Sequence, residues 1–571
     1  MAIKRLRLMA DFETTTDPKD VRVWAGCAVD IDKLEVAYLG TRLDDFIEFL
    51  SDKSVVCYFH NLRFDGEFLL HYLLTHGFKW EKGRDENGNK LPFKEKHFRT
   101  LITDDGLFYS IEVCFSRINS KKMYKTTFYD SYKKLPFPVA KIATGFGLAM
   151  TKGEIDYKTY RSPDHILTEE EKDYIIRDCE IVAEALKAQF EQGLTKMTNA
   201  SDAMSSYKET IGNKFTDWFP ILPDVLDDNI RKAYKGGFVY LNPKYKNVRG
   251  TKGRSYDVNS LYPSVMYEKV LPYGYPVFFE GKPEPTSTYP LYIIHLTCCF
   301  ELRPGYIPML QLKKNRRFVE TEYLTSSWTK IGNHWENEPV EMYLTSVDYE
   351  LFKEHYIITR ETLIDGWKFK GATGMFTKYI DYWMHIKETE KGPKRQLAKL
   401  QLNSLYGRFA LSTRTSQKIP YLDEKNVVRY KYSEEETRDP VYTAMGCFIT
   451  AYAREKTIRS AQKVYDRFIY ADTDSLHLAG HEDAEELDVH PTKLGYWKDE
   501  GLFDDSKFLR AKTYMETVDG VTKVTCAGMP DNVKEKVTYD NFCPGSTFDG
   551  KKMPRRYPGG IVLEETTFTI K

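Results

Sequence analysis

The sequence predicts a protein of several α/β domains, and three observations support that fold class. The chain has 571 residues, and at ~100–200 residues per domain this length predicts three or four substructures. Short segments in which apolar and polar residues alternate indicate strands, whereas longer segments with an apolar residue every three or four positions indicate helices. Both patterns occur in the first third of the chain and again after residue 250.

Composition excludes several classes of protein. Hydrophobic residues make up 42% of the chain and charged residues 29%, as in a globular rather than a disordered protein. No apolar run approaches ~18 residues, so no membrane span is expected. The basic first eight residues lack the apolar segment of a signal peptide, so secretion is not expected. Nine cysteines without CxxC or zinc-site spacing are expected to be reduced thiols in a cytosolic compartment.

The net charge is unusual for a protein that binds nucleic acid. The chain has 83 basic and 83 acidic residues, so its formal net charge is zero. A basic excess is typical of such proteins, but a local basic channel is compatible with zero net charge.

In the first third, acidic residues stand at predicted strand ends. A strand that begins at residue 6 runs into Asp11 and Glu13, which are two positions apart and therefore project from one face. A second strand, 55–59, is followed by Asn61 and Asp65, four residues apart at a strand-to-helix junction. These acids form the first candidate site.

A helix contributes a further acid to the first candidate site. Thr168 and Glu171 form the sequence pattern of a capping box and predict the helix start. Tyr174 and Asp178 are four residues apart on this helix, so phenol and carboxylate can face one site. The apolar stripe that predicts the helix consists of Ile175, Cys179, Val182 and Leu186.

Four acids from strands and helices are what a two-metal phosphodiester hydrolase requires. One ion activates water, and a second, ~3.5–4 Å away, stabilises the leaving oxygen. Tyr174 is placed to orient the water. Any one of these acids taken singly is more often a solvated surface residue. Their order, spacing and element type nevertheless agree as a set, which favours the site.

A second set of carboxylates lies after residue 250. The segment 468–478 is expected to form two short strands joined by a tight turn that carries Asp472 and Asp474. Two acids separated by one residue are common by chance in a chain with 83 acids, so this pair needs support from elsewhere. Asp257, at the end of the predicted strand before Tyr262, supplies a third carboxylate. Such oxygen ligands suit Mg²⁺, which completes its shell with water and substrate phosphates.

A basic helix is expected over residues 394–410. Its apolar stripe consists of Ala398, Leu402, Leu405 and Phe409. An adjacent polar stripe is suited to a triphosphate, because cations neutralise phosphates and an aromatic ring can contact a base. A solvated face is the alternative for any two lysines. The polar stripe consists of Arg395, Lys399, Asn403 and Tyr406.

Two further segments allow more than one interpretation. Tyr234-Lys235-Gly236-Gly237 is either a simple turn or a place where the backbone approaches phosphate closely. The basic segment 312–317 is either a solvated charge run or a contact with nucleic acid or protein.

The first candidate site resembles the exonuclease motifs of proofreading 3′→5′ exonucleases with a ribonuclease-H-like fold. The resemblance implies that Asp11, Glu13, Asp65 and Asp178 bind metal. Lys152-Gly153-Glu154 resembles a lysine motif of protein-primed polymerases, which adds Lys152 as catalytic and Glu154 as metal-binding. Ser131 is followed by Tyr132, where the family pattern has leucine. Taken singly, Phe64 and Tyr157 are more often core aromatics. The residues implied to hold a single-stranded 3′ end are Thr14, His60, Asn61, Phe64, Ser131 and Tyr157.

The second set resembles the conserved motifs of family B DNA polymerases. Asp257 and Asp474 are implied to bridge two Mg²⁺ supported by Asp472, with the Val258 carbonyl as a further ligand and Mn²⁺ as a substitute ion. Tyr262 is implied to exclude a 2′-hydroxyl. The implied nucleotide ligands are Val258, Tyr262, Lys387, Arg395, Lys399, Asn403 and Tyr406.

The same resemblance implies contacts with the template-primer. Lys512-Thr513-Tyr514 resembles the KxY motif, and strand geometry would place Lys512 and Tyr514 on one face. The YxGG element at 234–237 is implied to coordinate the exonuclease and polymerisation modules. The implied DNA-binding residues are Tyr234, Gly236, Gly237, Ser260, Gly407, Thr450, Arg454, Lys512 and Tyr514.

Because the matching motifs run in order from Asp11 to Tyr514 in a short chain, the sequence is identified as a member of the protein-primed family B DNA polymerases of phages related to Bacillus phage phi29. This implies processive, strand-displacing replication of a linear phage-type genome in the bacterial cytoplasm, with 3′→5′ proofreading. Implied partners are template-primer DNA, dNTPs, a terminal protein as primer, and single-stranded and double-stranded DNA-binding replication proteins. A monomer without membrane association is expected.

The resemblance also implies a domain order. A ribonuclease-H-like exonuclease precedes a right-hand polymerase of palm, fingers and thumb, with two insertions that contact terminal protein or DNA and close a ring around DNA. The expected units are exonuclease 1–198, first palm part 199–268, first insertion 269–374, fingers 375–410, hairpin insertion 411–443, second palm part 444–526 and thumb 527–571.

Other functions remain open from the residues alone. A stand-alone repair exonuclease would need only the first third of the chain, and a non-catalytic DNA-binding scaffold would tolerate the loss of a carboxylate. Asp257, Asp472 and Asp474 are all present, which argues against both. A family B polymerase that extends RNA or DNA primers is the nearest alternative.

Overall fold

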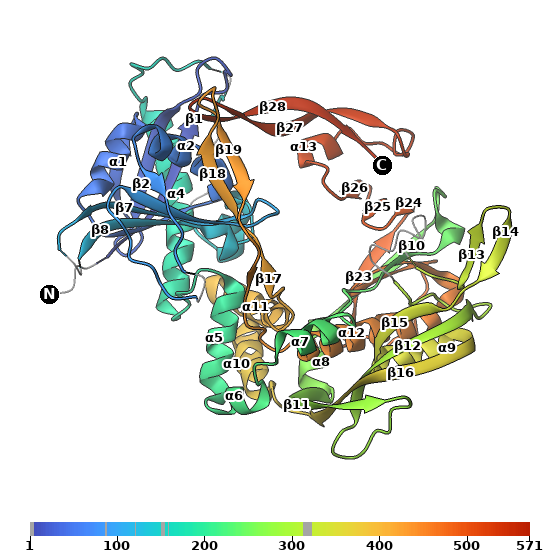
Figure 1. The fold of residues 1–571 in the computed structure, drawn as a ribbon. Helices are drawn as coiled ribbons and strands as arrows, with labels where there is room; N and C mark the ends of the chain where they lie inside the picture. Colours follow the sequence, from blue (N-terminus) through green and yellow to red (C-terminus); the bar gives the residue numbers. More distant parts are fainter. Residues whose placement is uncertain are drawn as a thin grey trace.

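The computed structural model describes residues 5–85, 88–119, 122–149, 153, 155–157, 159–311 and 323–571 (Figure 1). Lys152, Glu154 and the basic segment 312–317 lie outside the described residues. All nine cysteines are described and each is a free thiol, as predicted. Within the described residues, no helix is long and apolar enough to cross a membrane.

The N-terminal region is an eight-stranded mixed sheet with helices on both faces. The strand order is β3-β2-β1-β4-β8-β7-β6-β5, in which β1, β4 and β8 are parallel. Successive residues of β1 enter different cores, because Met9 packs with α4 on one face and Leu8 and Ala10 pack with α2 on the other. The elements are β1 (Leu6–Thr14), β2 (Val23–Asp30), β3 (Glu35–Gly40), α1 (Leu43–Ser51), β4 (Val55–Phe59), α2 (Leu62–Thr75), β5 (Lys79–Trp80), β6 (His97–Ile102), β7 (Phe108–Arg117), β8 (Met123–Asp130), η1 (Ser131–Lys133), α3 (Val139–Phe146) and α4 (Glu169–Glu191).

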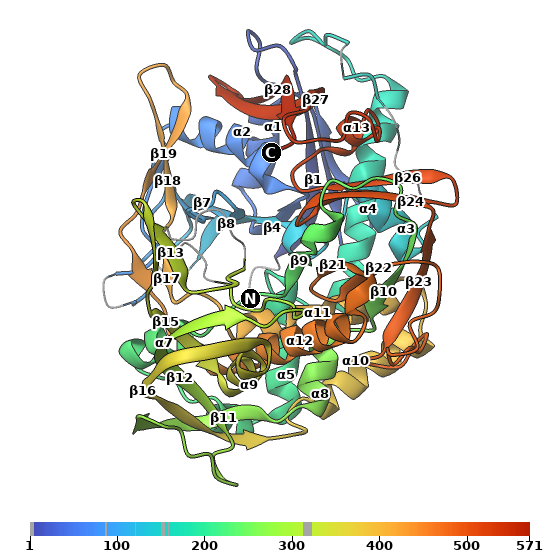
Figure 2. The same ribbon diagram turned by 90° about the vertical axis from the view of Figure 1, so that its right-hand side faces the viewer.

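A five-stranded sheet forms the centre of the second region. Its order is β23-β10-β22-β21-β9, and the long helix α12 packs against it (Figure 2). The predicted strand-turn-strand at 468–478 is confirmed as β21 and β22. The elements are β9 (Val239–Leu241), η2 (Pro243–Tyr245), β10 (Gly253–Val258), α8 (Leu261–Glu268), α12 (Thr443–Lys463), η5 (Tyr465–Arg467), β21 (Phe468–Asp472), β22 (Ser475–Ala479) and β23 (Trp497–Phe503).

A four-stranded antiparallel sheet projects from the centre on the side opposite the N-terminal region (Figure 1). Its order is β11-β16-β12-β15, and α9 packs on it. All of it lies within 269–374, where the first insertion is expected. The elements are β11 (Leu271–Glu280), β12 (Leu291–Leu302), β13 (Trp328–Ile331), β14 (His334–Asn337), β15 (Val340–Thr345), α9 (Ser346–His355) and β16 (Tyr356–Ala372).

Helices and a long hairpin connect the two regions. α10 and α11 pack against each other and against α5. The expected helix at 394–410 is shorter than predicted, because α11 ends at Ser404 and a short 3₁₀ turn follows. Its predicted apolar stripe is buried throughout. The elements are α5 (Asn199–Ile211), α6 (Lys214–Trp218), α7 (Asp224–Arg231), α10 (Thr377–Thr389), α11 (Gly392–Ser404), η4 (Tyr406–Arg408), β17 (Arg414–Thr415), β18 (Lys418–Leu422), β19 (Val428–Tyr432) and β20 (Glu436–Thr437).

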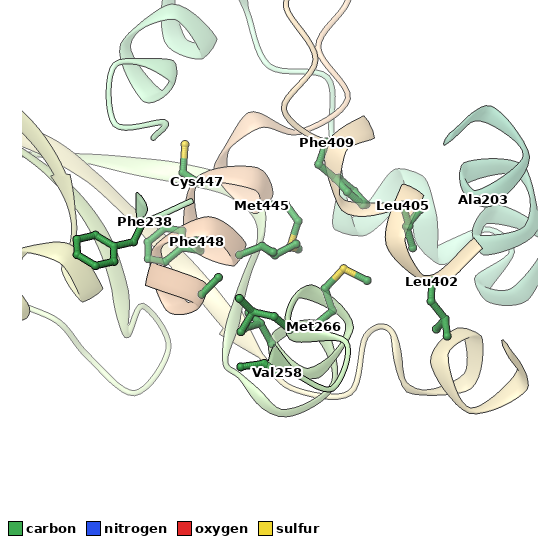
Figure 3. Packing of buried hydrophobic residues seen from close by; sticks show 14 of the residues in the cluster. Ala203, Phe238, Val258, Met266, Leu402, Leu405, Phe409, Met445, Cys447 and Phe448 are labelled. Atoms are coloured by element: carbon green, nitrogen blue, oxygen red, sulfur yellow. The ribbon is translucent and has the colours of Figure 1, made fainter. Parts of the chain in front are cut away.

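One continuous core joins α4, the central sheet and α11. Figure 3 labels part of this core: Val258 at the end of β10, Met445 and Phe448 on α12, and Leu402 on α11. At the core packing densities of proteins, such an interior transmits small displacements. The carboxylate end of β10 and the basic helix α11 therefore belong to one packed unit.

The C-terminal residues return to the N-terminal region. A three-stranded sheet is followed by a long hairpin whose β28 packs against α2 (Figure 1). At the hairpin turn, a Cβ at Gly560 would lie 2.4 Å from the ring of Phe68 on α2, so only glycine allows this close approach. The elements are β24 (Asp505–Arg510), β25 (Thr513–Val518), β26 (Val521–Cys526), α13 (Asp531–Lys534), β27 (Thr547–Tyr557) and β28 (Gly560–Thr569).

Candidate active sites

The first site lies on β1, where α2 and α4 meet the sheet. β1 carries Asp11 and Glu13, α2 carries Asp65 and α4 carries Asp178. Burial raises the pKa of Asp65 well above its usual range, and the neighbouring charges of Asp11 and Glu13 raise it further. Asp11 and Glu13 on β1 therefore interact electrostatically with Asp65 on α2.

Asp178 joins this cluster through Tyr174, which lies one turn earlier on α4. Burial raises the pKa of Tyr174, as do its hydrogen bond with Tyr157 and the charges of Glu13 and Asp178. The hydroxyls of Tyr157 and Tyr174 are 2.6 Å apart. The phenol of Tyr174 is thus held beside two of the acids, as the spacing of Tyr174 and Asp178 predicts.

The residues expected to hold a single-stranded 3′ end divide into two groups. Thr14 and Tyr157 line one cavity of about 220 Å³, together with Trp24 and Arg161. Tyr157 is 47% exposed and can be reached by a base. Asn61 is exposed and Phe64 is half-buried at the start of α2.

His60 and Ser131 belong to the second group, because their polar atoms bond within the protein. The His60 ring lies between the Ser131 hydroxyl, at 2.9 Å, and the Phe137 carbonyl, at 2.8 Å. Ser131 is fully buried and donates to the Phe59 carbonyl. In this structure Ser131 positions His60, and a direct contact of Ser131 with DNA stays a prediction.

The second site is a row of residues that crosses the five-stranded sheet. Asp257 on β10 lies opposite Ser475 on β22, and Ser475 lies opposite Asp472 on β21. Partners in an antiparallel sheet project from the same face, so the two aspartates share that face. Asp474 is in the turn, where its carbonyl accepts a 2.7 Å hydrogen bond from the Val258 amide.

The turn between β21 and β22 packs against Gly237, the second glycine of the segment 234–237. Thr473 has φ 62°, and its amide donates to the Phe238 carbonyl at 2.6 Å. A Cβ at Gly237 would lie 2.5 Å from the Thr473 hydroxyl oxygen. Gly237 is therefore required for close packing against the turn that carries the aspartates. This role differs from both interpretations of the sequence, a simple turn and a close approach to phosphate.

Burial and like charge raise the pKa of the two aspartates. The pKa of Asp257 is raised to about 7 by burial and then by Asp474 and Glu500. Burial also raises the pKa of Asp474, assisted by Asp472. Among the described residues, no group of three or more His, Cys, Asp or Glu side chains is assembled as an ion cage. Mg²⁺ takes one or two carboxylates plus substrate phosphates, and a divalent ion would relieve the repulsion between these acids, so the donor set fits it.

Cations gather beside the second site. Burial lowers the pKa of Lys387, and so do the neighbouring charges of Lys399 and Arg395. The Lys387 ammonium donates a 3.0 Å hydrogen bond to the hydroxyl of Ser260, which is three residues after Asp257. Asn403 is exposed at the end of α11, and Gly407 lies in the following 3₁₀ turn.

An aromatic pair lies between the carboxylates and the basic helix. The rings of Tyr262 and Tyr406 stack with centroids 3.8 Å apart and planes 15° apart. Burial raises the pKa of Tyr262, with contributions from Tyr406, Asp474 and Tyr234. Four residues that are distant in sequence, Tyr234, Tyr262, Tyr406 and Asp474, thus lie close together.

Two residues expected to bind the template-primer are buried. Arg454 is 4% exposed and makes a bidentate ion pair with Asp348, and it also donates to the carbonyls of Lys235 and Gly236. Thr450 is 1% exposed and donates to the Gly446 carbonyl. Arg454 therefore holds the glycine segment in place, and DNA contacts by either residue stay predictions.

Lys512 is not in a strand, contrary to the geometry expected from sequence. It has φ 56° in the turn before β25, so it does not share a strand face with Tyr514. Its ammonium instead donates to both carboxylate oxygens of Asp472, at 2.9 and 3.0 Å. The Tyr514 ring stacks on Phe508 with centroids 5.0 Å apart.

Sequence reasoning missed three residues that shape the sites. Asp130 accepts from the amides of Asn61 and Leu62 and so fixes the start of α2. Asp348 holds Arg454, and Lys498 lies opposite Asp257. Each is brought to its site by a strand or helix distant in sequence from the motifs, so the motifs do not predict its role.

The chain thus combines an α/β domain that carries a nuclease-type cluster of acids with a sheet whose aspartates lie near a basic helix. This combination is typical of nucleotide-polymerising enzymes with an attached nuclease-like domain. Residues 48–491 match the family described as DNA polymerase type B, organellar and viral. The chain belongs to this family of DNA polymerases.

Known phage polymerases are similar over the whole chain. The DNA polymerase of Bacillus phage Nf is 46% identical and covers all of both chains. That of Bacillus phage phi29 is 45% identical over 98% of each chain, and that of Streptococcus phage Cp-1 is 35% identical over 98% of each. The structure of phi29 DNA polymerase complexed with primer-template DNA covers both chains completely with a TM-score of 0.92 and 43% identity. The predicted family and multidomain fold are thereby confirmed.

Proposed function

We propose that this DNA polymerase extends a primer 3′-hydroxyl with dNTPs at the row formed by Asp257, Ser475 and Asp472. The observation that carries the proposal is the convergence of this row with the stacked tyrosines and the cations of α10 and α11. The similar phi29 enzyme has been determined with primer-template DNA and incoming nucleotide, which supports the same substrates here.

The carboxylates of Asp257 and Asp474, with Asp472 and the Val258 carbonyl, would hold two Mg²⁺, for which Mn²⁺ can substitute. Bound there, the ions would activate the 3′-hydroxyl and neutralise charge on the α-phosphate and leaving group. The chain itself positions the reactants, because phosphoryl transfer requires little covalent chemistry from the protein. Lys387, Arg395 and Lys399 bind the triphosphate, with Asn403 at the end of the same helix.

The stacked tyrosines select the sugar. Tyr262 lies beside the aspartates, and Tyr406 covers one face of its ring, which restricts the movement of the Tyr262 side chain. A 2′-hydroxyl on the incoming sugar would clash with this ring. Ser260, Gly407, the segment 234–237, Lys512 and Tyr514 contact the template-primer. Thr450 and Arg454 are buried, and Arg454 supports this surface by holding the carbonyls of Lys235 and Gly236.

We infer a 3′→5′ exonuclease at the first site. Asp11, Glu13, Asp65 and Asp178 would bind two further ions, and Tyr174 orients the attacking water. The cavity beside Thr14 and Tyr157 accepts the terminal nucleotide, with His60, Asn61, Phe64 and Ser131 around it. Lys152 and Glu154 are assigned to this site from sequence alone.

Processive, strand-displacing synthesis is proposed from the way the C-terminal hairpin meets the β18–β19 hairpin. The Arg556 guanidinium pairs with the buried carboxylate of Glu67 on α2, at 2.7 Å, and lies 4.8 Å from the ring centre of Tyr430 on β19. Helix α2, strand β19 and the C-terminal hairpin, which are distant in sequence, thereby contact one another. A closed path around DNA would slow dissociation and separate the strands ahead of synthesis.

Priming by a terminal protein is proposed from family membership and from the projecting four-stranded sheet of 269–374. The expected units, with boundaries at 198, 268, 374, 410, 443 and 526, are proposed in the same way. Single-stranded and double-stranded DNA-binding replication proteins are proposed as further partners of a monomeric enzyme that acts in the bacterial cytoplasm.

The test of protein priming uses labelled dATP, Mg²⁺ and a candidate terminal protein. Label should become covalently attached to the terminal protein, and the same enzyme should extend a DNA primer. Normal primer extension without any labelled protein would contradict protein priming and favour a polymerase that uses RNA or DNA primers.

The test of the closed path is Arg556→Ala. Product length per binding event should fall severalfold while single-nucleotide addition is unchanged, because the substitution removes the pair with Glu67. Arg555→Ala is the matched control, because the Arg555 side chain is 61% exposed. Equal product lengths for both variants would contradict the role of the Arg556 contact.

A further inference from the structure

One basic side chain beside the polymerisation site has no role in the proposed function. Lys498 on β23 lies directly opposite Asp257 on β10. Because antiparallel partners project from the same face, Lys498 extends the row that continues through Ser475 to Asp472. The carboxylate row therefore has a lysine at each end, with Lys512 bonded to Asp472 at the other.

Lys498 also lies close to the cations of α11. Burial lowers the pKa of Lys399, and the charges of Arg395 and Lys498 lower it further. The strand register places Lys498 beside Asp257, and its charge also reaches Lys399 on α11. Lys498 is thus near both the carboxylates and the basic helix.

The partner of Lys498 within the chain is weakly held. Its ammonium pairs with Glu500 at 2.5 Å, and both side chains are 43% exposed. The register of β10 against β23 shifts between Ser255 and Tyr256, which leaves Glu500 as the extra residue of a bulge. An exposed pair of this kind adds little to stability, so exchanging Glu500 for a phosphate costs little.

We propose that Lys498 binds the β- and γ-phosphates of the incoming nucleotide and holds the pyrophosphate until it leaves. The inference rests on the proposed function, in which the α-phosphate lies at Asp257 and the triphosphate tail extends toward Lys399. Lys498 neighbours the first group by strand register and acts electrostatically on the second, so its flexible side chain can reach such a tail. A lysine suits this position, because its ammonium is a compact charge on a flexible stem.

The experiment compares Lys498→Ala and Lys498→Arg with wild type on a primed template. For Lys498→Ala, the KM for dNTP and the inhibition constant of inorganic pyrophosphate should both rise about tenfold, with kcat within about twofold. Lys498→Arg should restore both constants to within about threefold of wild type, because the charge is retained. The matched control is Lys493→Ala, an exposed lysine before β23 that bonds to Tyr496.

Two results would overturn the inference. Unchanged KM and pyrophosphate inhibition in Lys498→Ala would exclude the phosphate contact, and a lower kcat with both constants unchanged would mean that Lys498 only supports the strand. Lys399→Ala separates this failure from failure of the proposed function. If Lys399→Ala raises the KM and Lys498→Ala does not, only the inference about Lys498 fails, whereas no effect from Lys399→Ala contradicts the triphosphate site itself.

Discussion

The two carboxylate sites of this chain differ in burial. At the first site Glu13, Asp65 and Asp178 are 7%, 3% and 5% exposed, and Asp11 is partly buried. At the second site Asp257 and Asp474 are only partly buried. A hydrolase needs a compact set of acids and one water, whereas a polymerase must admit a new nucleotide in every cycle.

The sites also differ in the charges that surround them. Burial and neighbouring acids raise the pKa of Asp65. At the second site, Lys512 bonds to Asp472 and Lys498 lies opposite Asp257. This difference fits the proposed functions, because a polyanionic triphosphate requires more positive charge nearby than a single phosphodiester does.

Removing one aspartate from each site gives the largest expected effect. Asp474→Ala should lower primer extension at least about 10³-fold and leave the exonuclease unchanged, because it removes a ligand that acts only at the second site. Asp11→Ala should do the reverse. Extension of a primed template and degradation of a single-stranded 3′ end measure the two activities. Loss of both activities in either variant, with the fold retained, would contradict two separate sites.

A smaller effect is expected from Gly237→Ala. The added methyl group would overlap the Thr473 hydroxyl and displace the turn that carries the aspartates, which should lower kcat for extension about 10²-fold. Adding Thr473→Ala should recover part of this loss, because the overlapping oxygen is removed. Gly145→Ala is the matched control, since a Cβ there meets no atom within 4 Å. Normal extension by Gly237→Ala would refute the packing requirement.

Tyr157→Phe tests the first site alone. Losing the hydroxyl that lies 2.6 Å from Tyr174 should lower the exonuclease rate about tenfold, because Tyr174 is then less well positioned. Single-turnover degradation of a 3′ end measures the rate. Tyr275→Phe, which removes a hydroxyl from a tyrosine on β11 that is 53% exposed, serves as the control. A slower primer extension in Tyr157→Phe would show that the two sites are not independent.

The smallest effect is a change in stability with pH at the second site. The pKa of Asp257 is raised to about 7, so its contribution to stability is fully present below the ordinary carboxyl pKa of ~3.8 and is lost as pH rises through about 7. Asp257→Asn cannot ionise, so in EDTA at pH 8 it should unfold about 2 °C above wild type. The difference should shrink toward pH 5, as measured by thermal unfolding. A constant difference across this range would mean that Asp257 is not the titrating group.

Local patterns in the sequence predicted several elements correctly. The capping box at Thr168 begins α4, and the strand-turn-strand at 468–478 is present. Patterns of this kind succeed because hydrophobic periodicity and capping act within one element. The pattern over 394–410 predicted the buried face but not the end of the helix at Ser404, since the same apolar residues pack equally well from a 3₁₀ turn.

The sequence by itself determined the family, the order of the motifs and the identity of the acids, because these are properties of residue types and spacings along the chain. Tertiary structure alone decided which residues surround them. It buried Arg454 against Asp348, turned Lys512 onto Asp472 and set Lys498 opposite Asp257. Strand register and long-range packing fix these pairs, and neither leaves a signal in the neighbouring residues.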